Sequence, residues 1–363
     1  MEDVENPARL PPYDSAGLKS YFAQFDSFGP SLMDIKTLAN PLLRVNWQLG
    51  NFCNYGCSYC SNICHSGSFP WPTIAKAEAI VRKIDQVYKQ EPYAKKKIVF
   101  ELLGGEVTVW QDLDRLLDLI KETDNLCMLV SNGSRNLDWW IKNAGKFGYT
   151  TLSFHPEKAD YKHVSAVANI LADAGVGVGI LVLMYPPRWD YCLEARQYFV
   201  ANSRAHTVAT QPLTLIPDST AAQNGTADTN GRWPYTVGQQ AWLKRTLTYH
   251  SKVPFKDSEW LNVGLKYFNR GEEKRWKNVE AAYLSAHGLN NWKDWDCFVG
   301  IDTLYVEQNG HVRRDAMCRV ASHLGNWRKD DGLETIEWPK EPVKCPFTAC
   351  LCAHDFRARR NKI

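Results

Sequence analysis

Hydrophobic and polar positions follow two alternating periods between residues 42 and 214. Residues 43–49 carry apolar side chains at every second position, the period of a β-strand with one buried face. Residues 73–90 carry them three or four apart, the stripe of an amphipathic helix. This order of strand and helix recurs in six units, and it predicts strands over residues 42–50, 97–106, 126–134, 150–157, 176–187 and 206–214.

Repeated strand–helix units predict a parallel sheet, so the expected fold class is α/β. Six units suit an open, partial (β/α)6 barrel better than a closed barrel of eight. Active sites of such folds lie at the carboxyl ends of the strands. The polar residues of this chain fall there: a cysteine loop, then Gly104-Gly105-Glu106, then Ser131-Asn132-Gly133, then His155.

The alternation of strands and helices is absent before residue 42 and after residue 216, and the chain is therefore expected to have four regions. Residues 1–41 form an N-terminal extension with a short helix at 21–25, and residues 42–216 form the barrel. Residues 217–295 form a helical insertion or linker, with helices expected over 237–252 and 272–288. Insertions often determine substrate choice, but a plain structural linker is equally compatible with this sequence. Residues 296–363 form a small C-terminal domain with a β-hairpin and a helix.

Composition narrows the class of protein. Hydrophobic residues make up 44% and charged residues 23% of the 363 positions, as in ordinary globular proteins. No apolar run approaches the roughly 20 residues that cross a bilayer, and the N-terminus lacks the apolar core of a signal peptide. We therefore expect a cytoplasmic protein with no membrane partner. A net charge of +3 is too small to indicate nucleic-acid binding.

The 11 cysteines are the main chemical signal. Cysteines at short spacings in a cytoplasmic protein indicate metal ligands more often than disulfides. Cys53, Cys57 and Cys60 follow the first strand. Iron–sulfur clusters normally take four thiolates, so three ligands leave one iron open for another molecule. Cys64 is either a fourth ligand or a loop thiol, and a zinc knuckle is the alternative use of the triplet.

This CxxxC-aromatic-C triplet after the first strand of a (β/α)6 pattern resembles the signature of the radical S-adenosylmethionine (SAM) enzymes, and Gly104-Gly105-Glu106 resembles the family's GGE motif. The resemblance implies a 4Fe–4S cluster whose open iron binds SAM, and a 5′-deoxyadenosyl radical that takes a hydrogen atom from substrate. It also implies an electron donor such as flavodoxin or ferredoxin.

The resemblance implies roles for further residues around SAM. Tyr59 would pack near the adenine, and backbone groups of Gly104, Gly105 and Glu106 would meet the SAM ammonium. Leu183, with Met184, would flank the adenine. The remaining positions are where the family often contacts the ribose or carboxylate: Ser131, Asn132, Ser153 and His155. For His155, a structural histidine with satisfied hydrogen bonds is the alternative.

A second group of cysteines lies near the C-terminus. Asn309-Gly310 between two alternating segments predicts a β-hairpin, and Cys297 and Cys318 flank it. Cys345, Cys350 and Cys352 follow. This arrangement resembles the auxiliary-cluster extension of radical SAM enzymes, in its SPASM or shorter twitch form, although the gap from Gly310 to Cys318 is longer than usual. The resemblance implies one auxiliary 4Fe–4S cluster on Cys297, Cys318, Cys345 and either Cys350 or Cys352. A structural zinc site is the alternative.

Two cysteines stand alone. Cys127 lies in the third strand and is expected to be a small buried hydrophobic residue. Cys192 follows the fifth strand, where a thiol can return a hydrogen atom to a substrate radical, as in epimerases of the superfamily. The function expected is a radical SAM oxidoreductase or maturase that modifies a natural product, small molecule or peptide. The alternatives are an epimerase using Cys192 and a metal-binding scaffold without turnover.

Overall fold

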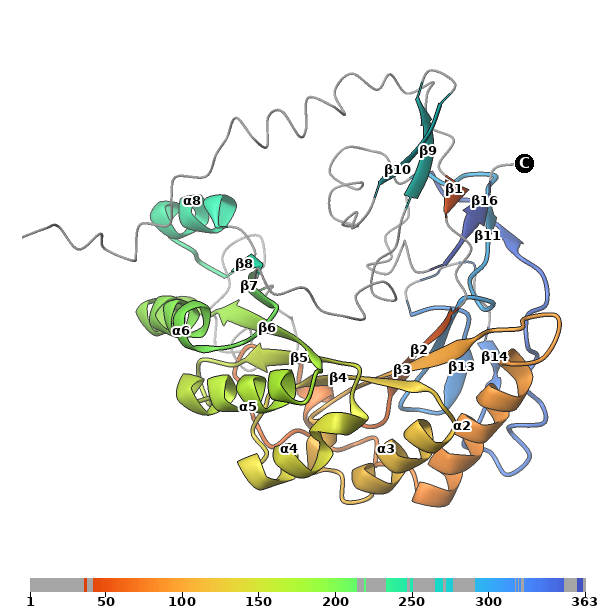
Figure 1. Cartoon of the computed structure of the whole chain (residues 1–363), viewed down its shortest axis with the longest axis horizontal. Helices are drawn as coiled ribbons and strands as arrows, with labels where there is room; N and C mark the ends of the chain where they lie inside the picture. The colour runs from red at the N-terminus through yellow and green to blue at the C-terminus, as the bar shows by residue number, and fades with distance from the viewer. Residues whose placement is uncertain are drawn as a thin grey trace, which may run out of the picture.

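A computed structural model provides the structure of this chain. It describes residues 36–37, 42–213, 219, 233–246, 249–250, 265–269, 272–276, 291–316, 318, 320, 323–348 and 358–361. Six parallel strands form its centre, and they confirm the α/β partial barrel (Figure 1). They are β2 (Leu42–Gln48), β3 (Lys97–Leu103), β4 (Leu126–Ser131), β5 (Tyr149–Phe154), β6 (Gly177–Met184) and β7 (Thr207–Pro212).

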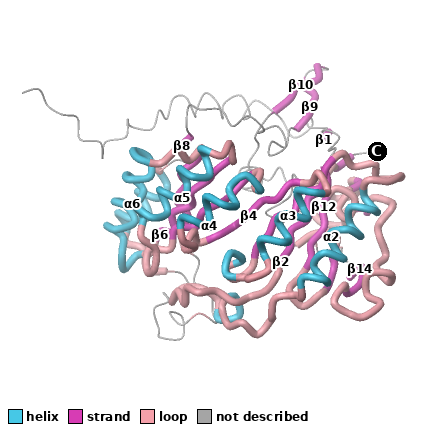
Figure 2. Tube along the Cα trace, turned by 60° about the horizontal axis from the view of Figure 1, so that its bottom comes forward, coloured by secondary structure: helices cyan, strands magenta, loops and turns pink. Residues whose placement is uncertain are grey.

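Five helices connect these strands and cover one face of the sheet (Figures 1 and 2). Three of them begin at capping side chains, because Thr73, Asn136 and Asp160 accept hydrogen bonds from backbone N–H groups of the first turn. The helices are α2 (Ile74–Tyr88), α3 (Leu113–Glu122), α4 (Leu137–Asn143), α5 (Tyr161–Asp173) and α6 (Trp189–Asn202). Short 3-10 turns lie at η1 (Asn62–Cys64), η2 (Val107–Val109), η3 (Ala144–Lys146) and η4 (Pro186–Arg188).

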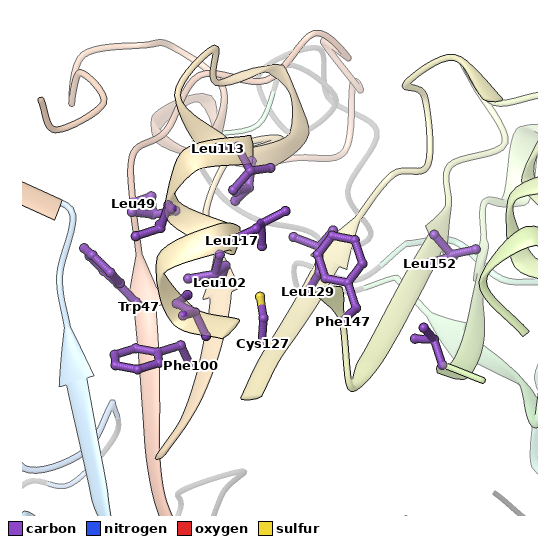
Figure 3. Close-up of a cluster of buried hydrophobic side chains, with 14 of the residues drawn as sticks. Trp47, Leu49, Phe100, Leu102, Leu113, Leu117, Cys127, Leu129, Phe147 and Leu152 are labelled. Atoms are coloured by element: carbon purple, nitrogen blue, oxygen red, sulfur yellow. The ribbon is translucent and has the colours of Figure 1, made fainter. Parts of the chain in front are cut away.

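The hydrophobic core lies between the sheet and its helices. Figure 3 shows Leu113 and Leu117 of α3 directed toward Leu102 and Leu129 of the sheet, with the Cys127 sulfur among them. Cys127 is 1% exposed, which confirms that it serves as a small buried hydrophobic residue. The strand period of two places the polar side chains of these strands on the opposite face. Buried polar residues of that inner face are Arg44, Asn46 and Glu101.

The predicted hairpin near the C-terminus is present, and it extends the barrel sheet. Its strands are β12 (Thr303–Val306) and β13 (His311–Arg313), followed by β14 (His323–Asn326). Gly310 has a φ of +95°, the left-handed conformation that this turn requires. Strand β12 pairs in parallel with β2, so the C-terminal region continues the sheet beyond its first barrel strand. The domain boundary at residue 296 stays a prediction.

Buried charged side chains hold the C-terminal region against the barrel. Asp302, which precedes β12, is fully buried and accepts a hydrogen bond from Lys95 at 2.5 Å. Its other carboxylate oxygen accepts from the backbone N–H and the Nε of Arg359, at 2.8 and 2.9 Å. Lys95 precedes β3 and Arg359 precedes the last described strand. One carboxylate therefore joins the barrel to two separate parts of the C-terminal region.

Two small sheets lie outside the barrel. One contains β11 (Asp296–Cys297), β15 (Val343–Lys344) and β16 (Arg360–Asn361), and the other contains β1 (Lys36–Thr37), β9 (Leu265–Asn269) and β10 (Glu272–Trp276). The expectation of a helix is therefore wrong for residues 272–276, although their Glu, Lys and Arg side chains favour helices. Antiparallel pairing with β9 overrides that weak local preference. Residues 277–288 and 21–25 lie outside the described residues.

The start of the insertion is helical, as expected, but its helix is shorter. Helix α8 (Val237–Arg245) begins with a capping box between Thr236 and Gln239, and β8 (Tyr249–His250) then pairs with β7. The predicted helix extended to residue 252. In the described part of the chain, no helix has the length and apolar character needed to cross a membrane.

Candidate active site at the barrel mouth

The cysteine loop between β2 and α2 is closed by a buried amide. Asn51 is fully buried, and its Oδ1 accepts a hydrogen bond from the Phe69 backbone N–H at 2.7 Å. Its Nδ2 donates to Ser66 Oγ at 3.1 Å and Ser68 Oγ at 3.0 Å. Asn51 therefore joins the two ends of the loop that carries the cysteines. Sequence reasoning missed it, and its place two residues before Cys53 was the only signal.

Gly104 and Gly105 allow the cysteine loop to lie directly on the end of β3. Their φ angles are +100° and +47°. A Cβ on Gly104 would lie 2.5 Å from Gly50 O, and one on Gly105 would lie 2.1 Å from Phe52 O. The Glu106 backbone N–H also donates to Phe52 O at 2.8 Å. The two glycines therefore let the backbone of the cysteine loop lie against the end of β3, and the contacts of Gly104, Gly105 and Glu106 to SAM stay predictions.

Glu106 is a buried residue whose carboxylate accepts four hydrogen bonds. Its carboxylate accepts from the Thr108 N–H and hydroxyl, from Ser131 Oγ at 2.8 Å and from the Asn132 N–H at 2.6 Å. Burial raises the pKa of Glu106, while these hydrogen bonds oppose that rise. The Asn132 amide also donates to Asn54 Oδ1 at 3.0 Å. Ser131 and Asn132 thus support the loop, and their contacts to SAM stay predictions.

The three loop thiols lie at the mouth of the barrel. The Cys53 sulfur accepts from the Tyr55 N–H at 3.3 Å, and the Cys57 sulfur lies 3.6 Å from Nδ1 of His155. Burial raises the pKa of Cys53 to about 11 and that of Cys57 to about 12. The pKa of Cys60 is raised first by a hydrogen bond with Cys64 and then by burial.

The donor chemistry of this loop fits a metal cluster. Thiols with such pKa values are neutral at pH 7, and a bound cation would supply the positive charge that stabilises their thiolates. Soft thiolate ligands favour iron–sulfur clusters or zinc over hard cations. In the described ranges, no three His, Cys, Asp or Glu side chains are already gathered at metal-binding distances. Cys64 lies beside Cys60, so its role as fourth ligand or loop thiol stays open.

Aromatic side chains line the site beside the thiols. Tyr59 stacks on His155 with ring centroids 6.0 Å apart, and its hydroxyl lies 3.2 Å from Nδ1 of that ring. Burial lowers the pKa of His155 to about 4, so its imidazole is neutral at pH 7. Leu183 packs in the same cluster as Cys57 and Tyr59. The structure therefore brings together three of the residues expected around SAM, and Ser153 lies in β5, two residues before His155.

Three residues of this site were missed by sequence reasoning. Glu157 accepts from the Ser58 N–H at 2.7 Å and from the Ser58 hydroxyl, which fixes the middle of the cysteine loop. Tyr185 packs on Tyr59 at 5.1 Å, and Trp233 packs on Tyr185 at 5.3 Å. Tyr185 directly follows β6 and Glu157 comes three residues after β5, and this place beyond a strand end was an available signal. Trp233 comes from the insertion, and no local pattern places it here.

The C-terminal cysteines meet at the small sheet of β11, β15 and β16. Cys297 lies opposite Val343 and Arg360 in the strand register, and Cys318 packs against its cluster. Burial raises the pKa of Cys297, Arg360 lowers it, and the nearby Cys318 and Cys345 raise it further. Three of the five expected ligands therefore lie close together. Cys350 and Cys352 lie outside the described residues, and the auxiliary site stays a prediction.

Cys192 lies on the helix side of the sheet. It is fully buried in α6, and its sulfur donates to Leu183 O at 3.5 Å. Burial raises the pKa of this thiol to about 11. The structure therefore places it behind β6, and its role as a hydrogen donor stays a prediction.

A family model and a curated relative both match this chain. Residues 47–187 match the family model described as the radical SAM superfamily. A curated relative, the S-adenosylmethionine-dependent nucleotide dehydratase of Thermoplasmatales archaeon (strain ISO4-H5), is 23% identical over 283 residues. That alignment covers 72% of this chain and 95% of the relative.

Two solved structures resemble this chain at low identity. Streptococcus suis SuiB bound to S-adenosylmethionine is 12% identical with a TM-score of 0.48, and the match covers 80% of this chain and 64% of SuiB. Native anSMEcpe with bound AdoMet is 13% identical with a TM-score of 0.47, and that match covers 82% of this chain and 83% of the other.

Proposed function

Because residues 47–187 match the family model of the radical SAM superfamily, we propose that this chain is a radical SAM enzyme that cleaves SAM and removes a hydrogen atom from a small-molecule or peptide substrate. The outcome we propose is oxidation of the substrate or formation of a C–X bond. The observation that carries the proposal is the loop of Cys53, Cys57 and Cys60, held against the end of β3 by Gly104 and Gly105.

The loop thiols would hold the cluster, and their neighbours would bind SAM. A 4Fe–4S cluster supplies, together with SAM, a 5′-deoxyadenosyl radical that takes a hydrogen atom from the substrate. Tyr59, His155 and Leu183 would form a wall for the adenosyl group, since they surround Cys57. Their burial would exclude water from the radical. Ser153, Ser131 and Asn132 would contribute polar contacts to the same molecule.

The C-terminal thiols would hold one auxiliary 4Fe–4S cluster, with Cys297, Cys318, Cys345 and either Cys350 or Cys352 as ligands. Such a cluster supplies a one-electron acceptor. Net oxidation would then balance, because the substrate loses a hydrogen atom to the adenosyl radical and afterwards one electron and one proton. Zinc at this position would leave the electron without that acceptor.

Anaerobic reconstitution followed by incubation with SAM and dithionite tests the proposal. We expect 5′-deoxyadenosine and methionine, with about eight irons per chain for two cubanes. About four irons together with zinc would confine the proposal to the barrel site. A protein that binds iron but releases no 5′-deoxyadenosine would instead be a metal-binding scaffold. Flavodoxin or ferredoxin should replace dithionite as the electron donor.

Nucleotide dehydration is a second candidate, favoured by the relative whose length this chain covers to 95%. Loss of water from a substrate radical consumes one electron and one proton, whereas oxidation releases them. The two reactions therefore have opposite electron balances, since dehydration takes up one electron after hydrogen abstraction and oxidation releases one. Incubation with CTP, UTP, GTP and ATP should give a product lighter by one water, and additional reductant consumed, if the chain is a dehydratase. Unchanged nucleotides would exclude this candidate.

Epimerisation is a third outcome, in which Cys192 returns a hydrogen atom to the substrate radical. The Cys192→Ala variant distinguishes it, because this variant would still form 5′-deoxyadenosine but would release no epimer. Reaction in deuterated water offers the matched measurement, since a thiol donor transfers solvent deuterium to the product.

A further inference from the structure

A tryptophan from the insertion lies inside the candidate site. Trp233 follows a long segment outside the described residues, and its ring is only 3% exposed. It belongs to the same buried cluster as Cys57, Tyr59 and Leu183. Its ring lies 6.4 Å from that of Tyr59 and 5.3 Å from that of Tyr185, with both pairs nearly perpendicular. It thus contacts the cysteine loop through Tyr59.

The backbone around Trp233 is fixed to the barrel. The Tyr235 hydroxyl donates to Met184 O at 2.6 Å and accepts from the Leu213 N–H at 2.8 Å. Met184 ends β6 and Leu213 follows β7, so this segment is attached at the carboxyl ends of two barrel strands. The capping box that begins α8 stabilises the residues directly after it. Trp233 is therefore held at the mouth of the barrel by the residues that directly follow it.

The indole N–H of Trp233 is buried and has no hydrogen-bond partner among the described residues. An unpaired buried donor costs about 1–3 kcal/mol, so native proteins usually provide an acceptor. Tryptophan is only a donor, and a ligand for it must offer an acceptor. The adenosyl group of SAM has ring nitrogens and ribose oxygens of this kind, and Tyr59 and Leu183 are the residues expected beside it.

We propose that Trp233 completes the SAM site, with its ring as a wall of the adenosyl pocket and its N–H as a donor to that group. This inference rests on the proposed function, because it takes SAM as the ligand. It gives the insertion a specific role, because residues 233–235 would carry part of the cofactor site.

The test compares Trp233→Phe with wild type in anaerobically reconstituted protein. Phenylalanine keeps a ring for packing and removes the donor. SAM is titrated into the reduced protein, and the change in the cluster's electron paramagnetic resonance spectrum reports binding. We expect Kd for SAM to rise about five- to tenfold, the effect of one lost hydrogen bond. The KM for SAM should rise by the same factor.

Trp242→Phe is the matched control, since Trp242 lies on α8 and packs against Trp189 at 5.3 Å, outside the site. It should leave the Kd for SAM unchanged. A Trp233→Phe variant with wild-type affinity would overturn the proposal. So would tighter binding by Trp233→Ala, because Trp233 would then occupy the space that SAM needs. If wild type itself shows no SAM-dependent spectral change, the proposed function fails as well, which separates the two conclusions.

Discussion

The two groups of cysteines are brought together by different means. Cys53, Cys57 and Cys60 lie within eight residues, in one loop that its own side chains and the end of β3 hold in place. Cys297, Cys318 and Cys345 come from three separate segments that meet through strand pairing and the buried Asp302. The first group depends on local chain geometry, whereas the second depends on how distant segments pack. They should therefore respond differently to the same kind of change.

Loss of a barrel thiol should have the largest effect. Cys57→Ser should abolish the proposed cluster of the barrel and reduce 5′-deoxyadenosine formation below detection, because Cys57 would be one of the three thiolates that hold it. About four irons should remain per chain if the C-terminal site is independent. Cys64→Ser, in the same loop, is the control and should keep both iron content and SAM cleavage. Loss of iron in that control would identify Cys64 as a ligand.

Loss of a C-terminal thiol should remove the other half of the iron. Cys345→Ser is expected to leave about four irons per chain and normal formation of 5′-deoxyadenosine without substrate. Iron analysis and Mössbauer spectra check this outcome. If SAM cleavage disappears together with the iron, the two sites depend on each other and the comparison between them does not hold.

Disruption of the buried carboxylate should affect the C-terminal site through stability. Asp302→Ala removes the carboxylate that forms the buried ion pair with Lys95, and removal of one member of a buried ion pair costs about 3–5 kcal/mol. Urea unfolding measures this loss. The exposed pair Asp173–Arg204 provides the control, because Asp173→Ala should change the free energy of unfolding by less than about 1 kcal/mol. Equal effects of the two substitutions would contradict the role given to Asp302.

A single methyl group should displace the cysteine loop more modestly. Gly105→Ala places a Cβ within 2.1 Å of Phe52 O and forces alanine into the left-handed region. We expect a cost of about 1–3 kcal/mol and a lower iron content, with the C-terminal site unchanged. Gly56→Ala is the control within the same loop, since no atom lies within 4 Å of its added Cβ. Full iron content in Gly105→Ala would show that the loop can move away from β3.

The parallel barrel follows from the sequence because its signals are local. Each of its strands and helices has its own hydrophobic period, and the structure places all of them close to the expected residues. The Asn309-Gly310 turn likewise predicts its hairpin from a few neighbouring positions. Residues 272–276 show where such reasoning fails, because their helix-forming side chains lie in a strand that pairs with β9.

The candidate site was predictable only in part. The thiol spacing and the Gly-Gly-Glu motif identify the loop and the end of β3 that supports it. Asn51 and Glu157 were missed, because a single polar residue in a loop carries no pattern until its partners are known. The same is true of the contacts of Ser131, whose hydroxyl is directed to Glu106 in the folded chain.

The sequence by itself determined the order of the strands and helices, the loop of three thiols and the glycines that let it approach β3. Periodicity and short spacings encode these features within a few residues. Only the tertiary structure decided that β12 continues the barrel sheet, that Asp302 joins three segments, and that Trp233 reaches the thiol loop. Those contacts join residues from about 60 to more than 250 positions apart, and their energy comes from burial that no local pattern records.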